Sequence, residues 1–303
     1  MKTFTKLGLL TLAICLSFSA HAHRSWMLPS ATILGGETPW VTVDAAVSND
    51  IFYFEHFPLQ IEGVGQPFAR PGAQQSPQAK TPDGKPAPQP MQRPRANLEI
   101  QRPDGSLAQP QFGNTGRYRS TFDVELDQKG TWKLAIANQG LFASYEENGE
   151  RKRWSGKLED LKTAIPAKAE KLQVTQTSSR MEVFVTSGAP SEQVLKPTGK
   201  GLELAPVTHP NDLVAGEAAR FAFLLDGKPA ADVKVTLIRE GIRYRDNLDE
   251  LELTTDARGE FSVTWPEAGM YWMEAVSSQP VNDNTPVTQR RDSYTATLEV
   301  MAP

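Results

Sequence analysis

The sequence predicts an all-β protein made of two immunoglobulin-like or transthyretin-like β-sandwich domains. Short runs in which apolar and polar residues alternate recur along the chain, and such alternation is typical of half-buried strands. Gly, Pro, Asn and Asp bound these runs, as they do in sheets joined by tight turns. About 280 residues follow a predicted leader, which is enough for two hydrophobic cores.

The predicted first domain covers residues 23–194. We expect its strands at residues 40–47, 97–100, 118–126, 132–137 and 179–186, with a hairpin turn at 103–106. The stretch 51–58 is dense in aromatic residues and ends at a proline. Residues 142–172 are charged, and the one element that we expect within them is a short helix at 157–163.

A predicted disordered insertion, residues 66–95, interrupts the first domain. Pro, Gln, Ala, Gly and basic residues dominate it, and aromatic or β-branched residues are scarce. Such a segment cannot bury enough apolar surface to offset the entropy lost on ordering. Because strand patterns lie on both sides, we interpret it as an insertion within the domain and not as a domain boundary.

The predicted second domain covers residues 205–303 and follows a connector at 195–204. Its expected strands are at residues 219–225, 233–239, 250–255, 260–265, 270–276 and 294–301. About seven short strands in roughly 95 residues is the pattern of an immunoglobulin-like sandwich. Tyr271 and Trp272 are neighbours in one of these strands, so their side chains should point to opposite faces of the sheet.

The N-terminus has the three parts of a secretory signal. Lys2 and Lys6 precede an apolar run at 7–18, and small residues ending in Ala20-x-Ala22 follow it. The apolar run is too short to span a bilayer as a helix. Cleavage after Ala22 would make His23 the first residue of the mature chain. We therefore expect residues 1–22 to be a signal peptide and the mature protein to be periplasmic and not membrane-spanning.

Composition excludes several classes of function. The formal charge is −4, and removal of Lys2 and Lys6 with the leader makes it about −6, whereas nucleic-acid binders need a basic patch. The one cysteine, Cys15, lies in the leader, so the mature chain can form no disulfide. The sequence has no Gly-rich phosphate loop, Gly-x-Ser-x-Gly elbow or His-Glu-x-x-His motif. We therefore expect no enzymatic activity.

Three histidines remain in the mature chain, and they are the predicted metal ligands. His23 would carry a free α-amino group beside its imidazole, which together make a bidentate chelator. His209 lies in a loop beside Pro210 and Asn211, a better place for a ligand than an apolar core. His56 is the third candidate. Three imidazoles and an amine suit copper, nickel or zinc.

Each histidine also has an ordinary interpretation. His23 is an accident of the cleavage position in this view, His56 a strand-end residue bonded to a backbone carbonyl, and His209 a surface residue without a role. A separate segment, residues 240–246, combines guanidinium, phenol and carboxylate groups and contains Arg243 and Arg245. These two guanidinium groups could bind an anionic ligand or pair with the many acidic residues of the second domain.

The predicted mature N-terminus carries the motif His23-Arg24-Ser25-Trp26-Met27-Leu28-Pro29. It resembles an exported bacterial family labelled nickel-uptake substrate-specific, or NikM-like, whose mature chains begin with His, an aromatic, an aliphatic and Pro. Residues 212–217, 226–230 and 255–259 look like the immunoglobulin-like half of the same family. The resemblance covers most of the mature chain. It implies transition-metal handling in the periplasm, near a membrane uptake system, with His23 as a ligand.

The leading hypothesis is therefore a periplasmic transition-metal-binding protein that assists metal uptake or handling. The alternative is an exported interaction module that binds a protein or a glycan without metal. A third hypothesis is a copper-dependent oxidative enzyme, because a mature N-terminal histidine resembles the histidine brace of copper carriers and lytic polysaccharide monooxygenases. Nothing beyond that first residue matches the latter enzymes.

Overall fold

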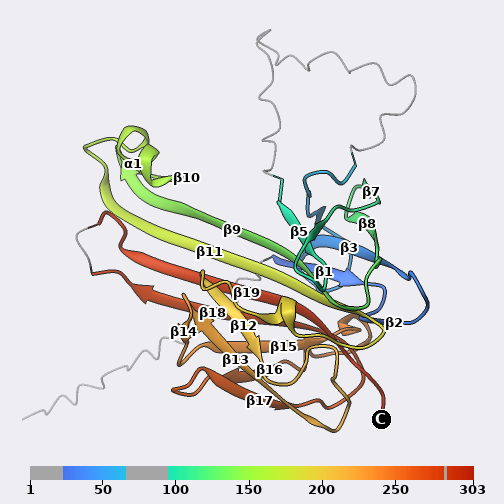
Figure 1. Ribbon diagram of the computed structural model, residues 1–303. Helices are drawn as coiled ribbons and strands as arrows, with labels where there is room; N and C mark the ends of the chain where they lie inside the picture. The colour runs from blue at the N-terminus through green and yellow to red at the C-terminus, as the bar shows by residue number, and fades with distance from the viewer. Residues whose placement is uncertain (1–22, 66–94, 283–284) are drawn as a thin grey trace, which may run out of the picture.

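Three β-sheets contain the strands of the protein in the computed structural model, which describes residues 23–65, 95–282 and 285–303 (Figure 1). The predicted all-β sandwich class is confirmed. Within these ranges, the helical elements are one short helix, α1 (Leu158–Ala164), and the 3₁₀ turns η1 (Gln193–Leu195) and η2 (Ile242–Tyr244). None of them has the length and hydropathy that crossing a membrane requires. The predicted leader and nearly all of the predicted insertion lie outside the described residues.

The N-terminal sheet has five strands from the first half of the chain. Its order is β1-β3-β8-β7, and β4 pairs with β3. Val41, Val43 and Ala45 are fully buried, while Thr42 between them is exposed, so the alternation in the sequence determines which face of the sheet meets the core. The strands are β1 (Arg24–Pro29), β3 (Trp40–Ser48), β4 (Phe57–Pro58), β7 (Phe112–Thr115) and β8 (Ser120–Glu125).

The long sheet has ten strands drawn from both halves of the chain. Its order is β16-β15-β18-β19-β11-β9-β5-β6, with β10 beside β9 and β2 beside β11. The strands from the first half are β2 (Ile33–Leu34), β5 (Leu98–Gln101), β6 (Leu107–Ala108), β9 (Gly130–Glu147), β10 (Glu150–Gly156) and β11 (Glu170–Ser187). Those from the second half are β15 (Lys234–Arg239), β16 (Leu251–Thr254), β18 (Gly269–Pro280) and β19 (Gln289–Val300).

Parallel pairing of β11 with β19 joins the two halves into this one sheet, from Thr175↔Gln289 to Val183↔Thr297. Side chains of β11 alternate between the two cores. Val183 and Val185 pack in the first core, with the N-terminal sheet, and Phe184 packs in the second core. The two sandwiches therefore share a sheet and lie on its opposite faces.

The C-terminal sheet covers the other face of the long sheet. It consists of β12 (Leu202–Pro206), β13 (Ala218–Leu225), β14 (Lys228–Pro229) and β17 (Glu260–Thr264). Phe221 and Phe223 of β13 are fully buried and face Tyr271 and Tyr294 of the long sheet within one core. As the sequence predicts, Tyr271 lies in this core, while the neighbouring Trp272 packs on the opposite face.

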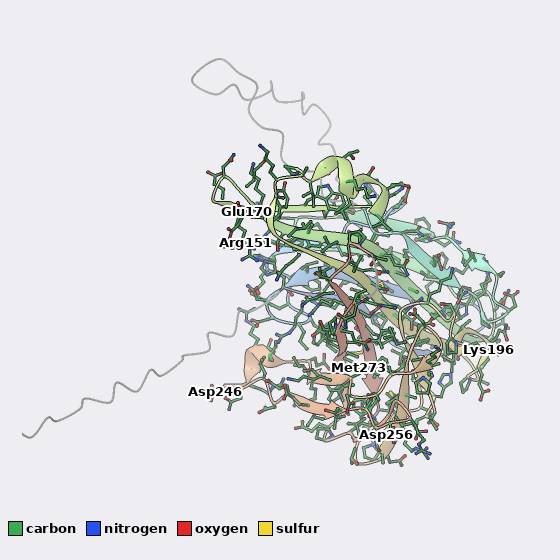
Figure 2. The ribbon with its side chains drawn as sticks, turned by 90° about the vertical axis from the view of Figure 1, so that its left-hand side faces the viewer. Arg151, Glu170, Lys196, Asp246, Asp256 and Met273 are labelled. Atoms are coloured by element: carbon green, nitrogen blue, oxygen red, sulfur yellow. The ribbon has the colours of Figure 1, made fainter. Side chains whose placement is uncertain are left out.

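Residues 142–172 differ from the sequence prediction. The expected helix is present as α1, but most of the segment extends β9, β10 and β11 into a long arm (Figure 1). Arg151 of β10 and Glu170 of β11, both labelled in Figure 2, pair with Glu146 from the two sides of β9 in this arm. Leu141, Tyr145 and Val174 are buried in a small core there. The many charged residues between them obscure this alternation in the sequence.

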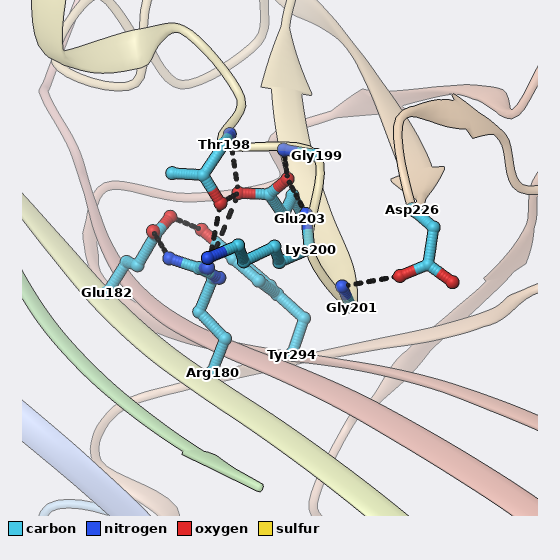
Figure 3. Close-up of polar contacts among 9 residues, drawn as sticks. All are labelled: Arg180, Glu182, Thr198, Gly199, Lys200, Gly201, Glu203, Asp226 and Tyr294. Atoms are coloured by element: carbon cyan, nitrogen blue, oxygen red, sulfur yellow. Dashed lines mark hydrogen bonds and ion pairs between the residues drawn. The ribbon is translucent and has the colours of Figure 1, made fainter.

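The predicted connector, residues 195–204, is also shorter than expected, because β12 begins at Leu202. Leu202 and Leu204 are buried in the second core. Glu203 between them is buried too, and Figure 3 shows the polar network around it. Its carboxylate accepts the backbone N–H groups of Thr198, Gly199 and Lys200, at distances between 2.6 and 3.1 Å. Glycines in 199–201 give this segment the composition of a linker, although its end is a strand.

Candidate functional site

His23 directly precedes β1, and β1 is held firmly on the long sheet. Trp26 and Met27 are fully buried. The Thr297 hydroxyl of β19 donates to the Met27 carbonyl at 2.6 Å, and the Trp272 indole N–H of β18 donates to the Ser25 carbonyl at 3.1 Å. These hydrogen bonds come from the second half of the chain, so β18 and β19 fix β1 in place.

His56 lies in the loop between β3 and β4. The rings of Phe52 and Phe54 meet the Trp26 indole edge-on, at centroid distances of 5.5 and 5.1 Å. The Glu55 carboxylate accepts hydrogen bonds from two backbone N–H groups at the start of the loop, at 3.2 and 3.3 Å. The aromatic stretch in the sequence therefore folds the loop back against β1, and this brings His56 to His23.

The two imidazoles meet directly. His56 Nε2 lies 3.0 Å from His23 Nε2, and the ring centroids are 4.1 Å apart at 80°. On the other side of the same ring, His23 Nδ1 lies 2.9 Å from the side-chain oxygen of Asn49. Both histidines are exposed to solvent. The sequence predicted these two residues as ligands, and the structure brings them together.

Asn49 orients the His23 ring in a way that suits metal binding. An amide oxygen only accepts hydrogen bonds, so the Asn49 contact assigns the proton of His23 to Nδ1. The lone pair of His23 Nε2 then points at His56. Metal-bound histidines commonly donate their other ring N–H in this way. Both Nε2 atoms could contact one ion at the usual distance of about 2.0–2.1 Å, so this donor set fits a metal.

The chelate expected from the sequence uses different atoms. A ring closed through the α-amine of His23 must use Nδ1, because Nε2 lies on the far side of the imidazole. In the structure, Nδ1 is engaged by Asn49. The amine chelate therefore requires the His23 ring to turn and to give up this hydrogen bond. The pair of Nε2 atoms keeps this hydrogen bond and requires only that the proton between the two rings leave His56 Nε2.

The structure does not bring His209 to this pair. Its Nε2 lies 3.0 Å from the Thr131 hydroxyl, and its Nδ1 accepts the Asn211 backbone N–H at 3.1 Å. Burial lowers the pKa of His209, although the Ser191 carbonyl and the nearby Asp212 oppose this shift. These contacts place His209 between the sandwiches as a neutral structural residue. Across the described ranges, no group of three or more His, Cys, Asp or Glu side chains is placed to hold a metal.

Arg243 and Arg245, the two arginines that the sequence suggested as anion ligands, contact other parts of the protein in the structure. The Arg245 guanidinium donates to the backbone carbonyls of Arg239, Glu240 and Leu248, at 2.8 to 3.1 Å, and so closes its own loop. The Arg243 guanidinium lies over the Tyr53 ring, 4.6 Å from its centroid. The segment therefore supports the loop that carries His56, because Ile242 also packs with Trp26 in a shared cluster.

Sequence reasoning missed a cavity next to His23. Its volume is about 140 Å³, and its wall includes Arg24 and Glu274 together with His23 and Trp272. The available signal was a carboxylate in the middle of the predicted strand 270–276, two residues from Trp272 and therefore on the same face. Asn49 was also missed, because Ser-Asn-Asp after a strand has the pattern of an ordinary turn.

Comparison with protein families gives one match. A family described as "Domain of unknown function (DUF4198)" matches residues 20–279, which is most of the chain. The matched range begins just before His23 and ends at residue 279, before β19. A search of curated proteins found no match.

Three solved structures show low similarity to the chain. The chain is 15% identical to an Escherichia coli alpha-2-macroglobulin activated by porcine elastase, with 91% of this chain and 20% of that chain covered and a TM-score of 0.20. It is 12% identical to the D0-D1 domain of Intimin, with 90% and 97% covered and a TM-score of 0.20. It is also 12% identical to dimeric latent PorU from Porphyromonas gingivalis, with 95% and 21% covered and a TM-score of 0.19. The chain thus spans about a fifth of the first and third of these proteins.

Proposed function

We propose that this chain, which belongs to the family of the domain of unknown function DUF4198, binds a divalent transition metal through His23 and His56 after export. The observation that carries the proposal is the 3.0 Å separation of the two Nε2 atoms. Asn49 supports it by holding the proton of His23 on the opposite nitrogen. Exposure of both rings leaves room for water or a partner's side chain to complete the coordination.

The donor set limits the choice of metal. Imidazole nitrogen suits copper, nickel and zinc, and affinity at such a site rises from nickel to copper in the usual divalent order. Two imidazoles without a carboxylate or a thiolate form an open, weakly charged site. Such a site suits a protein that receives and releases an ion more than one that stores it permanently.

The setting of this activity follows from the resemblance to NikM-like exported proteins. A mature chain that begins at His23, in the periplasm and near a membrane uptake system, would bind the ion before transport. We propose a carrier or accessory role, with binding and no catalysis. His209 is not part of this site, since its nitrogen atoms are engaged by Thr131 and Asn211.

The test is calorimetric titration of exported, processed protein with copper, nickel and zinc, after mass spectrometry has established the N-terminus. His56→Ala should abolish the binding, and His209→Gln should leave it unchanged. Circular dichroism would verify that both variants are folded. Equal binding by the wild-type protein and His56→Ala would contradict the proposal, as would the absence of binding by the wild-type protein.

A further inference from the structure

A recess on the long sheet lies beside His23, at the place where β1 crosses β11 and β19. Its volume is about 140 Å³. This is well above the ~10–15 Å³ that a single water needs, so the recess has room for a small molecule. Ile136, Met181 and Trp272 are buried and give the recess an apolar floor. A concave site with an apolar floor and a few polar groups is typical of small-molecule binding.

Strand register collects the polar groups of this recess on one face. Ser179 of β11 is paired with Asn138 of β9 and with Ser293 of β19. Glu274 of β18 is paired with Thr295 of β19, two residues beyond Ser293. Directly paired residues point to the same face of a sheet. All five residues line the recess, so a ligand within it would meet hydroxyl, amide and carboxylate groups on that face.

Glu274 is a carboxylate that lacks a close partner in the part of the chain that the structure describes. No hydrogen bond or ion pair of its side chain is found there, although it is half-buried. Burial raises its pKa, and the more distant charges of Arg291 and Arg24 only partly oppose this effect. A buried carboxylate without a donor is costly, and a bound cation would relieve that cost.

Arg24 supplies the opposite charge on the same wall. Its guanidinium lies over the Trp272 ring, 5.5 Å from the centroid, and donates one hydrogen bond, to the Asn49 carbonyl at 3.3 Å. A guanidinium has five N–H donors in all. Within the described residues, Arg24 and Glu274 make no ion pair at 4.0 Å or less, although both line this recess. Arg180 is different, because Glu182 and Glu203 already bind it.

We propose that this recess binds a small zwitterion, an α-amino acid, with its ammonium group at Glu274 and its carboxylate at Arg24. Two opposite charges that share a cavity without touching match a ligand that carries both charges close together. The floor formed by Ile136, Met181 and Trp272 would then take the ligand's side chain. The recess adjoins the histidine pair, because His23 lines it and His56 does not, and the proposal requires no bound metal.

The experiment is a calorimetric titration of processed, EDTA-treated protein with L-alanine, L-leucine and L-histidine. N-acetyl-L-leucine and L-leucine methyl ester, which lack the ammonium or the carboxylate charge, are the matched probes. We expect binding of at least one amino acid and no binding of either derivative. Glu274→Gln and Arg24→Gln should each weaken the binding at least tenfold. Glu99→Gln, which changes an exposed glutamate of β5, should leave it unchanged.

Either of two results would overturn the proposal: no binding of any of the three amino acids, or equal binding by the wild-type protein and both recess variants. Thermal unfolding of each variant shows whether it is folded, and the two substitutions on different strands guard against a single misfolded variant. His56→Ala should still bind the amino acid. Failure of the amino-acid titration together with normal metal binding would therefore contradict this inference alone, and the reverse result would contradict the metal proposal alone.

Discussion

The side-chain oxygen of Asn49 lies 2.9 Å from Nδ1 of His23, on the side of the ring opposite to His56. This contact joins the residue after β3 to the residue before β1. It determines which nitrogen of His23 carries the proton and which one is free to bind a metal. The orientation of one ring therefore depends on a residue of a simple turn.

Replacing Asn49 should weaken metal binding without unfolding the protein. In Asn49→Ala the His23 ring loses its acceptor, so its Nε2 lone pair is no longer held toward His56. Loss of such a supporting hydrogen bond typically costs about 10–100-fold in metal affinity. Calorimetry of the processed protein measures this change. Asn49→Asp keeps an acceptor and should bind at least as well as wild type. Wild-type affinity in Asn49→Ala would show that the orientation of this ring is irrelevant.

An extra residue before His23 distinguishes the two possible forms of the site. It converts the α-amine into an amide, which is a poor ligand, and leaves both imidazoles in place. If the two Nε2 atoms bind the metal, the extended protein should keep most of its affinity. If the α-amine and Nδ1 of His23 form the chelate, the extended protein should lose its affinity for the metal. We expect the first result, because Asn49 already occupies Nδ1, and calorimetry of the two proteins side by side decides between them.

Strands such as β3 and β13 could be predicted because each has a buried and an exposed face. The sharing of one sheet by the two sandwiches could not be predicted from the sequence. It depends on the parallel pairing of Ser179 with Ser293, two residues that are far apart in the sequence and surrounded by ordinary alternating patterns. No local sequence pattern distinguishes a strand that pairs within its own domain from a strand that pairs with the next domain. The domain boundaries in the sequence therefore stay a prediction, and β12 begins at Leu202, within the predicted connector.

The candidate site was predictable in part. Scarcity of histidine singled out His23, His56 and His209, and the structure brings the first two together. His209 has the sequence surroundings of a ligand because Pro and Asn flank it. Its imidazole instead belongs to a hydrogen-bonded chain with Thr131 and Asn211. Loop composition shows that a residue is near the surface, but the neighbours of its ring depend on tertiary packing.

Burial of His209 predicts a pH dependence of stability. Its pKa is lowered in the folded protein, whereas in the unfolded chain it has the ordinary value of about 6.5. Below that pH the unfolded state takes up a proton that the folded state does not accept. The free energy of unfolding should therefore fall as the pH drops from about 6.5 toward the lower folded value. Urea denaturation at a series of pH values measures this slope.

His209→Gln is the control for that measurement, because glutamine keeps a polar group for Thr131 but does not titrate. The variant should show a smaller decrease in the free energy of unfolding over the same pH range. Asp212 and Glu192 lie near enough to interact with the charge of His209, and both are retained in the control. An identical slope in the wild-type protein and the variant would assign the pH dependence to other groups.

The buried network around Glu203 should be a major contribution to stability (Figure 3). Burial raises the pKa of this carboxyl, but hydrogen bonds from Thr198 and Gly199 and the charge of Arg180 together lower it further than burial raises it. Glu203→Ala would leave Arg180 with one fewer partner and several backbone donors unsatisfied, so it should cost about 3–5 kcal/mol. Glu252→Ala, which breaks the exposed pair with Lys234, should cost at most about 1 kcal/mol. Chemical denaturation measures both, and similar costs would show that burial adds nothing at Glu203.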